Sequence, residues 1–527
     1  MKYPKFSPAL SRNVLRVFFL GSIMFLFAIQ VTDYLNFGVD DVFISMRVAE
    51  NAANGHGFVY NIGENVEGYS NPLWVAFLTV GARLGFNSSH SQFALLWFAK
   101  GMSFAFGIGV LILLFFIAKN FEEDPEAPVP LRFLVLLVAV SCGPFVLWCC
   151  GGLESTMAAF FFTLSVFLFL KIRKKHSSAE AAPLSLCFFF SVVLGLAALV
   201  RPEPVLHGVA ALAFVIAAFG RRMRRSEIFS LLLPFAVIFS AFLLWRYITY
   251  GDLLPNTFYA KTGGGLKSYG LSIKYLLGGV CMIGGTLMLA GFFAFSRRGE
   301  PVFTYCIVLI TVTLIFILYS GGDWMAGYRF FIPVAPVFFL LIAVGIARMM
   351  TILRTNTIFG PAGILRLFSF IVFLSYSSAF AGRILIRGQI QTMPTGFSEQ
   401  TGHSTPWHVE VGNWIRAHSE KPPVVATGEA GMIGYLNMDM RLIDLLGLMD
   451  KHIAYERKHS LGADANYVLD QKPDYILLAG NDAQSVIVAN SRPGGDYFGA
   501  IGGSRRFHEE YHLEKSFISL SLYARNK

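Results

Sequence analysis

Two adjacent carboxylates, Asp40 and Asp41, lie just after the first apolar run of a chain that is otherwise mostly hydrocarbon. A carboxylate held near a hydroxyl group can accept its proton while the oxygen forms a new bond. One of the pair could instead cap a helix, which the sequence predicts from Val42 to about Asn54, where Gly55 would end it. Both interpretations hold together if one aspartate caps the helix and the other acts as a base.

Two acidic residues and an arginine follow at the ends of later apolar runs. Glu154 comes after a Cys-Cys-Gly-Gly turn, and the motif Arg201-Pro-Glu203 ends another run. An arginine at a membrane boundary often only extends toward lipid headgroups. Glu203 argues against that interpretation, because a carboxylate gains nothing from anionic lipid. We therefore include Glu154, Arg201 and Glu203 in the candidate site.

The loop from Tyr250 to Gly265 combines a turn, hydroxyl groups, a cation and a run of glycines. A cation beside a flexible hinge suits a phosphate group that must enter and leave a site. Tyr259 and Lys261 are the candidate residues of this loop. The alternative is an ordinary solvated connector built from common turn residues.

A third polar segment places Asp323, Trp324 and Arg329 where another apolar run begins. Sugars stack on aromatic faces, and the guanidinium group of arginine binds phosphate through two parallel hydrogen bonds. An isolated aromatic pair here could simply belong to the interfacial aromatic belt. The flanking Asp323 and Arg329 favour a functional role.

The remaining candidates lie near Asp40, and several familiar motifs do not occur. His56 stands between glycines and Glu67 precedes Gly-Tyr. His403 and His408 share no helix face, so we expect surface histidines and predict no metal site. The sequence contains no P-loop and no His-Glu-x-x-His motif. The six cysteines lie in or beside predicted spans and imply no disulfide framework.

Composition identifies the elements that must position these residues. Hydrophobic residues make up 55% of the chain and charged residues only 14%, which is typical of a polytopic membrane protein. The net charge of +10 comes from basic stretches between apolar runs, and we interpret it as a topology signal rather than a nucleic-acid site. A run of about 20 apolar residues can span a bilayer, and roughly eleven such runs occur. They lie near 14–30, 92–118, 131–150, 154–170, 184–200, 205–219, 228–247, 272–296, 302–319, 329–350 and 361–381.

The distribution of lysine and arginine predicts the orientation of these spans. Basic stretches on cytoplasmic loops would place the N-terminus in the cytoplasm and put all the candidate site residues on the outer face. The apolar segment from Leu73 to Phe86 is short and carries Arg83, so we expect a juxtamembrane or partly embedded helix within the first outer loop, residues 31–91. The predicted outer segments after it are 151–154, 201–203, 248–271, 321–329 and everything beyond about 382.

Composition changes again near residue 385, which divides the chain into a membrane domain, 1–384, and a C-terminal domain, 385–527. The C-terminal domain has evenly distributed charges and an ordinary domain size of roughly 140 residues. We expect short buried strands at Val424–Thr427 and Tyr475–Ala479, and an amphipathic helix at Trp407–His418. These patterns predict an extracytoplasmic mixed α/β domain.

Taken together, these motifs resemble the GT-C glycosyltransferase superfamily. The resemblance includes Asp40-Asp41, Val66-Glu67-Gly-Tyr, Gly-Leu-Glu154, Arg201-Pro-Glu203, Pro255-Asn-Thr-Phe-Tyr-Ala-Lys261 and Gly322-Asp-Trp-Met to Arg329. Within the superfamily it is greatest to the branch typified by the mycobacterial terminal β-(1→2)-arabinofuranosyltransferase. Gly431-Met-Ile-Gly434-Tyr and Leu442-Ile-Asp444-Leu-Leu-Gly447-Leu are similar to the outer domain of that branch.

The resemblance implies an inverting transferase with a GT-C fold in a bacterial inner membrane. Its donor would be a polyprenyl-phosphate sugar, by resemblance arabinofuranose, and its acceptor a glycan of the cell envelope. The catalytic base of the superfamily maps onto Asp40 or Asp41; we favour Asp40, with Asp41 as the cap. Arg201, Lys261 and Arg329 would bind the donor phosphate. The other candidates would bind substrate: His56, Glu67, Glu154, Glu203, Tyr259, Asp323 and Trp324.

Several alternatives remain open from the sequence. The same fold could transfer another sugar to lipopolysaccharide or to protein. A lipid-linked-sugar transporter or flippase is the main rival from another class, and a non-catalytic envelope scaffold is a third. A monophosphate donor needs less neutralising charge than a diphosphate, so we expect no required metal cofactor. We also expect a monomer in contact with membrane lipid.

Overall fold

The computed structural model describes most of the chain and divides it into two compact units. Unit 1 comprises residues 1–35, 100–239 and 270–392, and unit 2 comprises residues 36–99, 240–269 and 393–527. Unit 2 thus groups the first outer loop with the C-terminal region. The described residues are 8–122, 129–178, 180–261, 267–284, 300–323, 325–355, 374, 376–377, 380–386, 396–398, 407–459, 463–479, 497–517 and 520–526.

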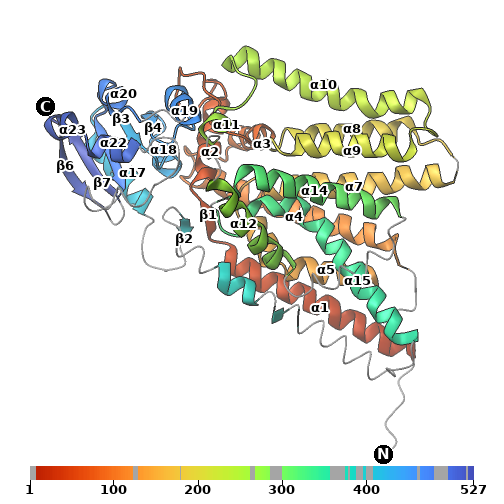
Figure 1. Cartoon of the computed structure of the whole chain (residues 1–527). Helices are drawn as coiled ribbons and strands as arrows, with labels where there is room; N and C mark the ends of the chain where they lie inside the picture. Colours follow the sequence, from red (N-terminus) through yellow and green to blue (C-terminus); the bar gives the residue numbers. More distant parts are fainter. Residues whose placement is uncertain are drawn as a thin grey trace, which may run out of the picture. The chain divides into compact units, whose positions relative to one another are not determined.

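Unit 1 is built from apolar helices (Figure 1). Contacts join α5 to α1 and α15, and α7 to α8 and η3. Three helices, α4, α10 and α12, continue into unit 2. The helices are α1 (Pro8–Tyr34), α4 (Ala94–Lys119), α5 (Leu131–Ser141), α6 (Gly143–Cys149), α7 (Ser155–Ser177), α8 (Leu184–Ala198), α9 (Pro204–Phe219), α10 (Arg225–Tyr250), α12 (Lys267–Gly284), α14 (Pro301–Ser320), η3 (Arg329–Val334) and α15 (Ala335–Thr355).

The predicted class, a multi-pass membrane protein, is confirmed, but the predicted number of spans is not. Six helices of the described residues are long and apolar enough to cross a bilayer, or seven if the bent pair α5–α6 is one span. Three further apolar helices are shorter: Leu184–Ala198, Pro204–Phe219 and Ser272–Ile283. Most of the run predicted at 361–381 lies outside the described residues.

Burial distinguishes the central helices from the peripheral ones. The most apolar window of Arg329–Thr351 is 83% buried within the protein, whereas that of α10 is only 17% buried. Since α10 is strongly apolar, its exposed surface must face lipid. The bend between α5 and α6 measures 78° and has a local cause. Pro144 lies at the start of α6 and cannot donate a helical hydrogen bond.

Most of the segment predicted as the first outer loop belongs to unit 2 and contains two short helices, α2 (Asp41–Ala53) and α3 (Pro72–Arg83), which pack on each other. The helix predicted after Asp40 is confirmed, and Gly55 follows its end with a positive φ of 87°. α3 has 12 residues and is about 18 Å long, so it cannot span a bilayer. The expected short helix is therefore confirmed. A strand before α2, β1 (Phe37–Val39), pairs antiparallel with β2 (Gly396–Ser398).

The C-terminal part of unit 2 contains a mixed five-stranded sheet in the order β4-β3-β5-β7-β6. β3 (Val424–Thr427) lies parallel to both β4 (Arg441–Asp444) and β5 (Tyr475–Ala479). β7 (Leu520–Arg525) is antiparallel to β5 and to β6 (Tyr511–Ser516). The predicted strands at Val424 and Tyr475 and the predicted helix α17 (Trp407–His418) are confirmed. The short helices of this part are α18 (Met432–Leu436), α19 (Lys451–Lys458), α20 (Ala465–Asp470), α22 (Tyr497–Gly502) and α23 (Arg505–Glu510).

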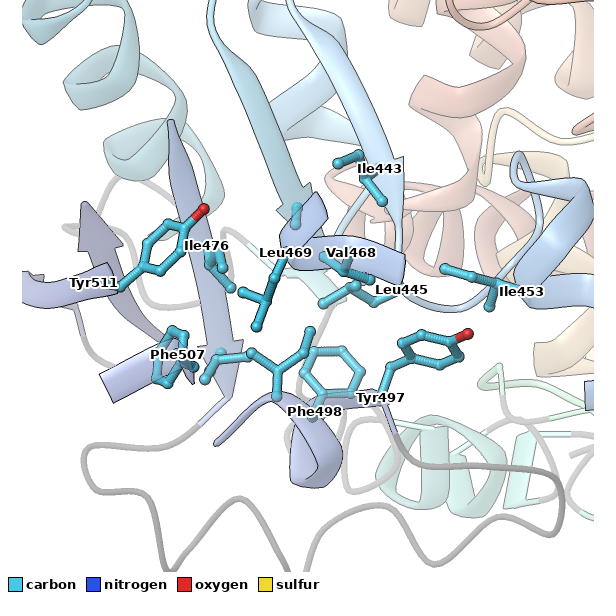
Figure 2. Close-up of a cluster of buried hydrophobic side chains, with 13 residues drawn as sticks. Ile443, Leu445, Ile453, Val468, Leu469, Ile476, Tyr497, Phe498, Phe507 and Tyr511 are labelled. Atoms are coloured by element: carbon cyan, nitrogen blue, oxygen red, sulfur yellow. The ribbon is translucent and has the colours of Figure 1, made fainter. Parts of the chain in front are cut away.

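A hydrophobic core packs against this sheet. Figure 2 shows its side chains, which come from the strands and from the short helices between them. Ile443 comes from β4 and Ile476 from β5, the two strands on either side of β3, and Phe498 and Ile501 come from α22. The core excludes water from the sheet and fixes the positions of the loops that leave its strands.

One buried cation connects α2 to the loops around α18. Arg47 is 1% exposed, and its Nε donates to the Tyr60 carbonyl at 2.9 Å. Its Nη1 donates to the carbonyls of Gly434 and Asn437, and its Nη2 to that of Met440. The guanidinium group therefore supplies buried carbonyl groups with charge-assisted hydrogen bonds, in addition to the donors that Tyr60, Gly434 and Asn437 have from Asn51 Nδ2 and the backbone.

Asp444 performs the corresponding role for backbone donors at the end of β4. Its carboxylate accepts hydrogen bonds from the backbone N–H groups of Leu446, Leu448 and Met449. Burial raises the pKa of Asp444 to about 6, although these N–H groups oppose the shift and Asp450 adds to it. The folded protein therefore binds this proton more tightly than the unfolded chain does.

We predict that Arg47→Met destabilises unit 2 without disturbing the membrane helices. Methionine fills a similar volume but removes the hydrogen bonds that the guanidinium group donates to four buried carbonyl groups, and bonds that involve a charged group contribute about 1.5–3 kcal/mol each. Tryptophan fluorescence of the full-length protein in detergent would show an apparent unfolding temperature well below that of the wild type. The control is Arg83→Met, since Arg83 is exposed on α3. Equal unfolding temperatures for the two variants would contradict the role of Arg47.

We also predict that stability falls as the pH rises from about 4 to about 6. The raised pKa of Asp444 means that the folded state binds more protons in this window, so the free energy of unfolding decreases there by about 2 kcal/mol. Unfolding temperatures measured across this range should show a shallower slope for Asp444→Asn than for Asp439→Asn, a change at an exposed position. Identical slopes would show that Asp444 has no such shift. Burial raises the pKa of Asp450 in the same direction, so some slope should remain.

Candidate functional site

Asp40 lies between β1 and α2, and its side chain reaches the start of α18. Its Oδ2 accepts a hydrogen bond from Gly431 N at 2.7 Å, and its Oδ1 accepts one from Met432 N at 2.8 Å. A Cβ at position 431 would lie 2.4 Å from the Asp40 carboxylate, so only glycine allows this approach. Asp40 is 7% exposed and is thus a buried carboxylate with backbone partners.

The two aspartates occupy different positions from those we assigned to them. Asp40, not Asp41, is at the N-cap position of α2, and its side chain makes no capping hydrogen bond there. Asp41 is the first residue of the helix and is half-buried. Its negative charge lies near the favourable N-terminal end of the helix dipole. The capping role predicted for Asp41 is therefore wrong, whereas the identity of the base stays a prediction.

Asp40 has two titratable neighbours that sequence reasoning did not place there, His408 on α17 and Glu429 after β3. His408 Nε2 lies 3.3 Å from Glu429 Oε2 and 3.9 Å from Asp40 Oδ1. We expected His408 to be a surface histidine, but it is 3% exposed. The expectation was wrong because α17 packs against α18 and buries its first turn. His403 lies outside the described residues.

Charge and burial oppose each other in this group. Burial alone lowers the pKa of His408, but the negative charges of Asp40 and Glu429 outweigh it and raise the pKa. Burial and the charges of Asp40 and Asp41 raise the pKa of Glu429, while His408 opposes them. Glu429 follows the carboxyl end of a parallel strand, where ligand-binding residues of α/β sheets commonly lie. That position is the signal by which the sequence could have identified it.

Glu67 forms a buried ion pair with an arginine that our sequence analysis missed. Arg246 Nε lies 2.6 Å from Glu67 Oε2, and Arg246 Nη2 donates to Glu67 Oε1 at 3.0 Å. Arg246 escaped notice because it lies inside the predicted span 228–247, where no charge was expected. Burial raises the pKa of Glu67, and Arg246 opposes that shift. Glu67 is 1% exposed, and this pair fixes its orientation.

The remaining candidates of unit 2 lie nearer to solvent. His56 is exposed in the turn after α2. Tyr259 is half-buried on α11 (Asn256–Lys261), and the Lys458 ammonium lies 4.7 Å from the centre of its ring. Lys261, the last residue of α11, is exposed. Asn256 fixes the start of α11 because its side chain donates to the carbonyls of Gly447 and Leu448 and its backbone donates to that of Glu67.

In unit 1, the turn before α9 brings Arg201 between two carboxylates. Arg201 Nη1 donates to Glu154 Oε1 at 2.6 Å, and Arg201 Nε donates to Glu203. All three side chains are at least 90% buried. The predicted association of Glu154, Arg201 and Glu203 is therefore present in the structure. The Arg201 guanidinium also lies 5.1 Å from the centre of the Phe330 ring.

Asp323 and Arg329 form a second buried ion pair in unit 1. Arg329 Nε lies 2.7 Å from Asp323 Oδ2, and the guanidinium group lies 5.7 Å from the same Phe330 ring that Arg201 approaches. Trp324 lies outside the described residues. Two guanidinium groups that are each paired with carboxylates thus lie near the same aromatic ring. A phosphate group at Arg201 or Arg329 would have to compete with a carboxylate that is already bound.

Comparison with known proteins relates this architecture to membrane transferases. Residues 392–526 match a family described as a domain of unknown function, DUF8728. A 234-residue stretch, 43% of this chain, is 28% identical to the terminal β-(1→2)-arabinofuranosyltransferase of Mycobacterium tuberculosis. That match spans only 35% of the mycobacterial protein.

Two solved structures are similar over nearly the whole chain. ArnT from Cupriavidus metallidurans bound to undecaprenyl phosphate has a TM-score of 0.60 at 12% identity, with 96% of this chain and 97% of ArnT covered. The oligosaccharyltransferase of Archaeoglobus fulgidus, tethered to an acceptor peptide, has a TM-score of 0.54 at 12% identity, with 97% of this chain and 74% of that protein covered. The likeness shows the fold: this chain has the GT-C fold with a C-terminal α/β region.

We predict that Arg201→Met strongly destabilises unit 1, because it leaves Glu154 and Glu203 buried without a cation. Removing one partner of a buried ion pair costs about 3–5 kcal/mol. The apparent unfolding temperature in detergent should fall for Arg201→Met but not for Arg221→Met, since Arg221 is exposed. Adding Glu154→Gln and Glu203→Gln to Arg201→Met should restore part of the loss. A triple variant no more stable than Arg201→Met would contradict an electrostatic cause.

Proposed function

We propose that this protein is a GT-C glycosyltransferase that moves a sugar from a polyprenyl-phosphate donor to an acceptor hydroxyl group at the outer face of the membrane. The single observation that carries the proposal is the likeness in fold, over 96% of the chain, to ArnT bound to undecaprenyl phosphate. Polar clusters at the ends of apolar helices support it, because such positions can meet a lipid-borne donor and an aqueous acceptor. The proposed acceptor is a glycan of the cell envelope of a bacterium.

Arabinofuranose is the donor sugar that we propose. The 28% identity to the mycobacterial arabinofuranosyltransferase supports this choice over the sugars that other GT-C proteins transfer. We further propose that the reaction inverts the anomeric carbon, as a direct attack by the acceptor hydroxyl would do. Transfer of another sugar to lipopolysaccharide or protein is the nearest alternative.

Proton transfer determines which carboxylates matter most. The acceptor hydroxyl must lose its proton as the new bond forms, so a carboxylate within about 3 Å has to accept it. Both oxygens of Asp40 already accept backbone hydrogen bonds, which hold this side chain at the start of α18. We therefore assign the base role to Asp41, which starts α2, and a positioning role to Asp40. This reverses the assignment that the sequence alone favours.

The leaving phosphate gains negative charge, which a cation must stabilise. Lys261 is the proposed first contact, since its ammonium group lies on an exposed helix end beside the glycine-rich loop. Arg201 and Arg329 would take part only by exchanging a carboxylate partner for phosphate. Glu67, Glu154, Glu203, His56, Tyr259, Asp323 and Trp324 remain the proposed substrate-binding residues.

The test is a transfer assay with the full-length protein in lipid nanodiscs. A synthetic polyprenyl-phosphate arabinofuranose serves as donor, an arabinan oligosaccharide as acceptor, and mass spectrometry of the product as readout. We expect Asp41→Asn to lower turnover by about 10²–10⁴-fold, the usual contribution of a general base. Asp40→Asn should also lower the unfolding temperature, because its amide would face backbone N–H groups. Asp439→Asn, at an exposed position, is the control.

The outcomes separate the competing functions. Near wild-type turnover in both Asp40→Asn and Asp41→Asn would contradict the assignment of the base to this pair. If product forms only from another donor lipid, the sugar on that lipid is the donor sugar and the assignment to arabinofuranose is wrong. Movement of the donor lipid between leaflets without any product would favour a flippase and contradict the transferase.

A further inference from the structure

We propose that Asp40, His408 and Glu429 bind one divalent transition-metal ion of the Zn²⁺ type. The three residues come from the first outer loop, from α17 and from the loop after β3, and all belong to unit 2. This inference does not depend on the proposed transferase activity. A metal at this position would contribute to the stability of unit 2 whatever reaction the protein catalyses.

The distances between the ligand atoms fit a single ion. One donor atom from each side chain lies within 4.8 Å of the others. His408 Nε2 is 3.3 Å from Glu429 Oε2 and 3.9 Å from Asp40 Oδ1. Ligands about 2.1 Å from a tetrahedral ion lie roughly 3.4 Å apart, so an ion needs only a small adjustment of the Asp40 side.

The donor set has the chemistry of a transition-metal site. One imidazole nitrogen and two carboxylates are common ligands of Zn²⁺, with room for water at a fourth position. A calcium or magnesium site would be expected to use oxygen ligands alone. Two carboxylates carry two negative charges in a region where Asp40 is 7% and His408 3% exposed. A dication balances those charges, whereas a protonated imidazole balances only one of them.

Surrounding groups orient the ligands, as in established metal sites. Ligating carboxylates are usually hydrogen-bonded by outer groups that fix their direction. Here the N–H groups of Gly431 and Met432 hold both oxygens of Asp40, and each oxygen retains a second lone pair. The N–H of Glu429 donates to Thr427 Oγ1 at 3.1 Å, which fixes the loop after β3. The close approach at Gly431 leaves no space for a side chain there.

A different interpretation makes His408 a protonated residue that donates its Nε2–H to Glu429 and needs no ion. The two interpretations predict different responses to metal. A hydrogen-bonded ion pair keeps its stability in a chelator and gains nothing from added Zn²⁺. A metal site loses stability in the chelator and regains it with a stoichiometric ion.

The experiment uses the full-length protein in detergent, with its purification tag removed, after dialysis against a chelator. We expect added Zn²⁺ to bind at one equivalent by elemental analysis and to raise the apparent unfolding temperature. Co²⁺ in place of Zn²⁺ should give visible absorption bands that report the bound ligands. His408→Ala and Glu429→Gln should each weaken binding at least tenfold and change the Co²⁺ spectrum. His56→Ala removes an exposed histidine of the same unit and should change neither the Zn²⁺ affinity nor the Co²⁺ spectrum.

Wild-type protein that retains no Zn²⁺ and whose unfolding temperature does not respond to it would overturn the proposal. Zn²⁺ binding that survives both His408→Ala and Glu429→Gln would place the ion elsewhere and overturn it equally. The spectrum of bound Co²⁺ still identifies the ligands of the ion if a variant is less stable, because only protein that holds the ion contributes to it. Intact metal binding with no sugar transfer would contradict the proposed function alone.

Discussion

The carboxylate of Asp40 is the interaction on which the organisation of unit 2 depends. Its two oxygens accept hydrogen bonds from the backbone N–H groups at the start of α18. The absence of a side chain at Gly431 allows the carboxylate to approach so closely. Charge-assisted hydrogen bonds of this kind are stronger than neutral ones, particularly where water is excluded. Arg47, in the second turn of α2, completes the attachment by donating to a carbonyl within α18 and to another just after it. One short helix thus offers a carboxylate to backbone donors and a guanidinium group to backbone acceptors.

Among the described residues of the candidate site, buried charged side chains generally form ion pairs. Arg201 bridges Glu154 and Glu203, Arg329 holds Asp323, and Arg246 holds Glu67. The fold brings Glu154 and Glu67 to their arginines, whereas Glu203 and Asp323 are near their arginines in the sequence. In the proposed transferase, the paired carboxylates would hold the arginines in position before the phosphate of the donor binds.

Periodicity and composition were sufficient for much of the fold, because hydrophobic runs and short alternating strands depend on local sequence. The helix after Asp40, the short helix α3, the strands β3 and β5 and the helix α17 were all predicted on this basis. The number of spans was not predicted in this way, since α8 and α9 are apolar but shorter than a helix that crosses the bilayer. The partners of the charged residues could not be predicted either. His408 and Glu429 lie more than 360 residues from Asp40, and only tertiary packing decides that they meet.

The order of strands in the sheet has a consequence for how the protein behaves in a crowded compartment. β6 lies at the sheet edge, where unpaired backbone groups could recruit a strand from another chain. His512 and Glu514 are exposed on β6 beside the exposed Leu513, Lys515 is half-buried, and the register with β7 shifts between Leu513 and Lys515. Charges and a local irregularity at an edge both oppose strand addition. This edge of the sheet is therefore a poor template for a strand from another chain, even at high protein density.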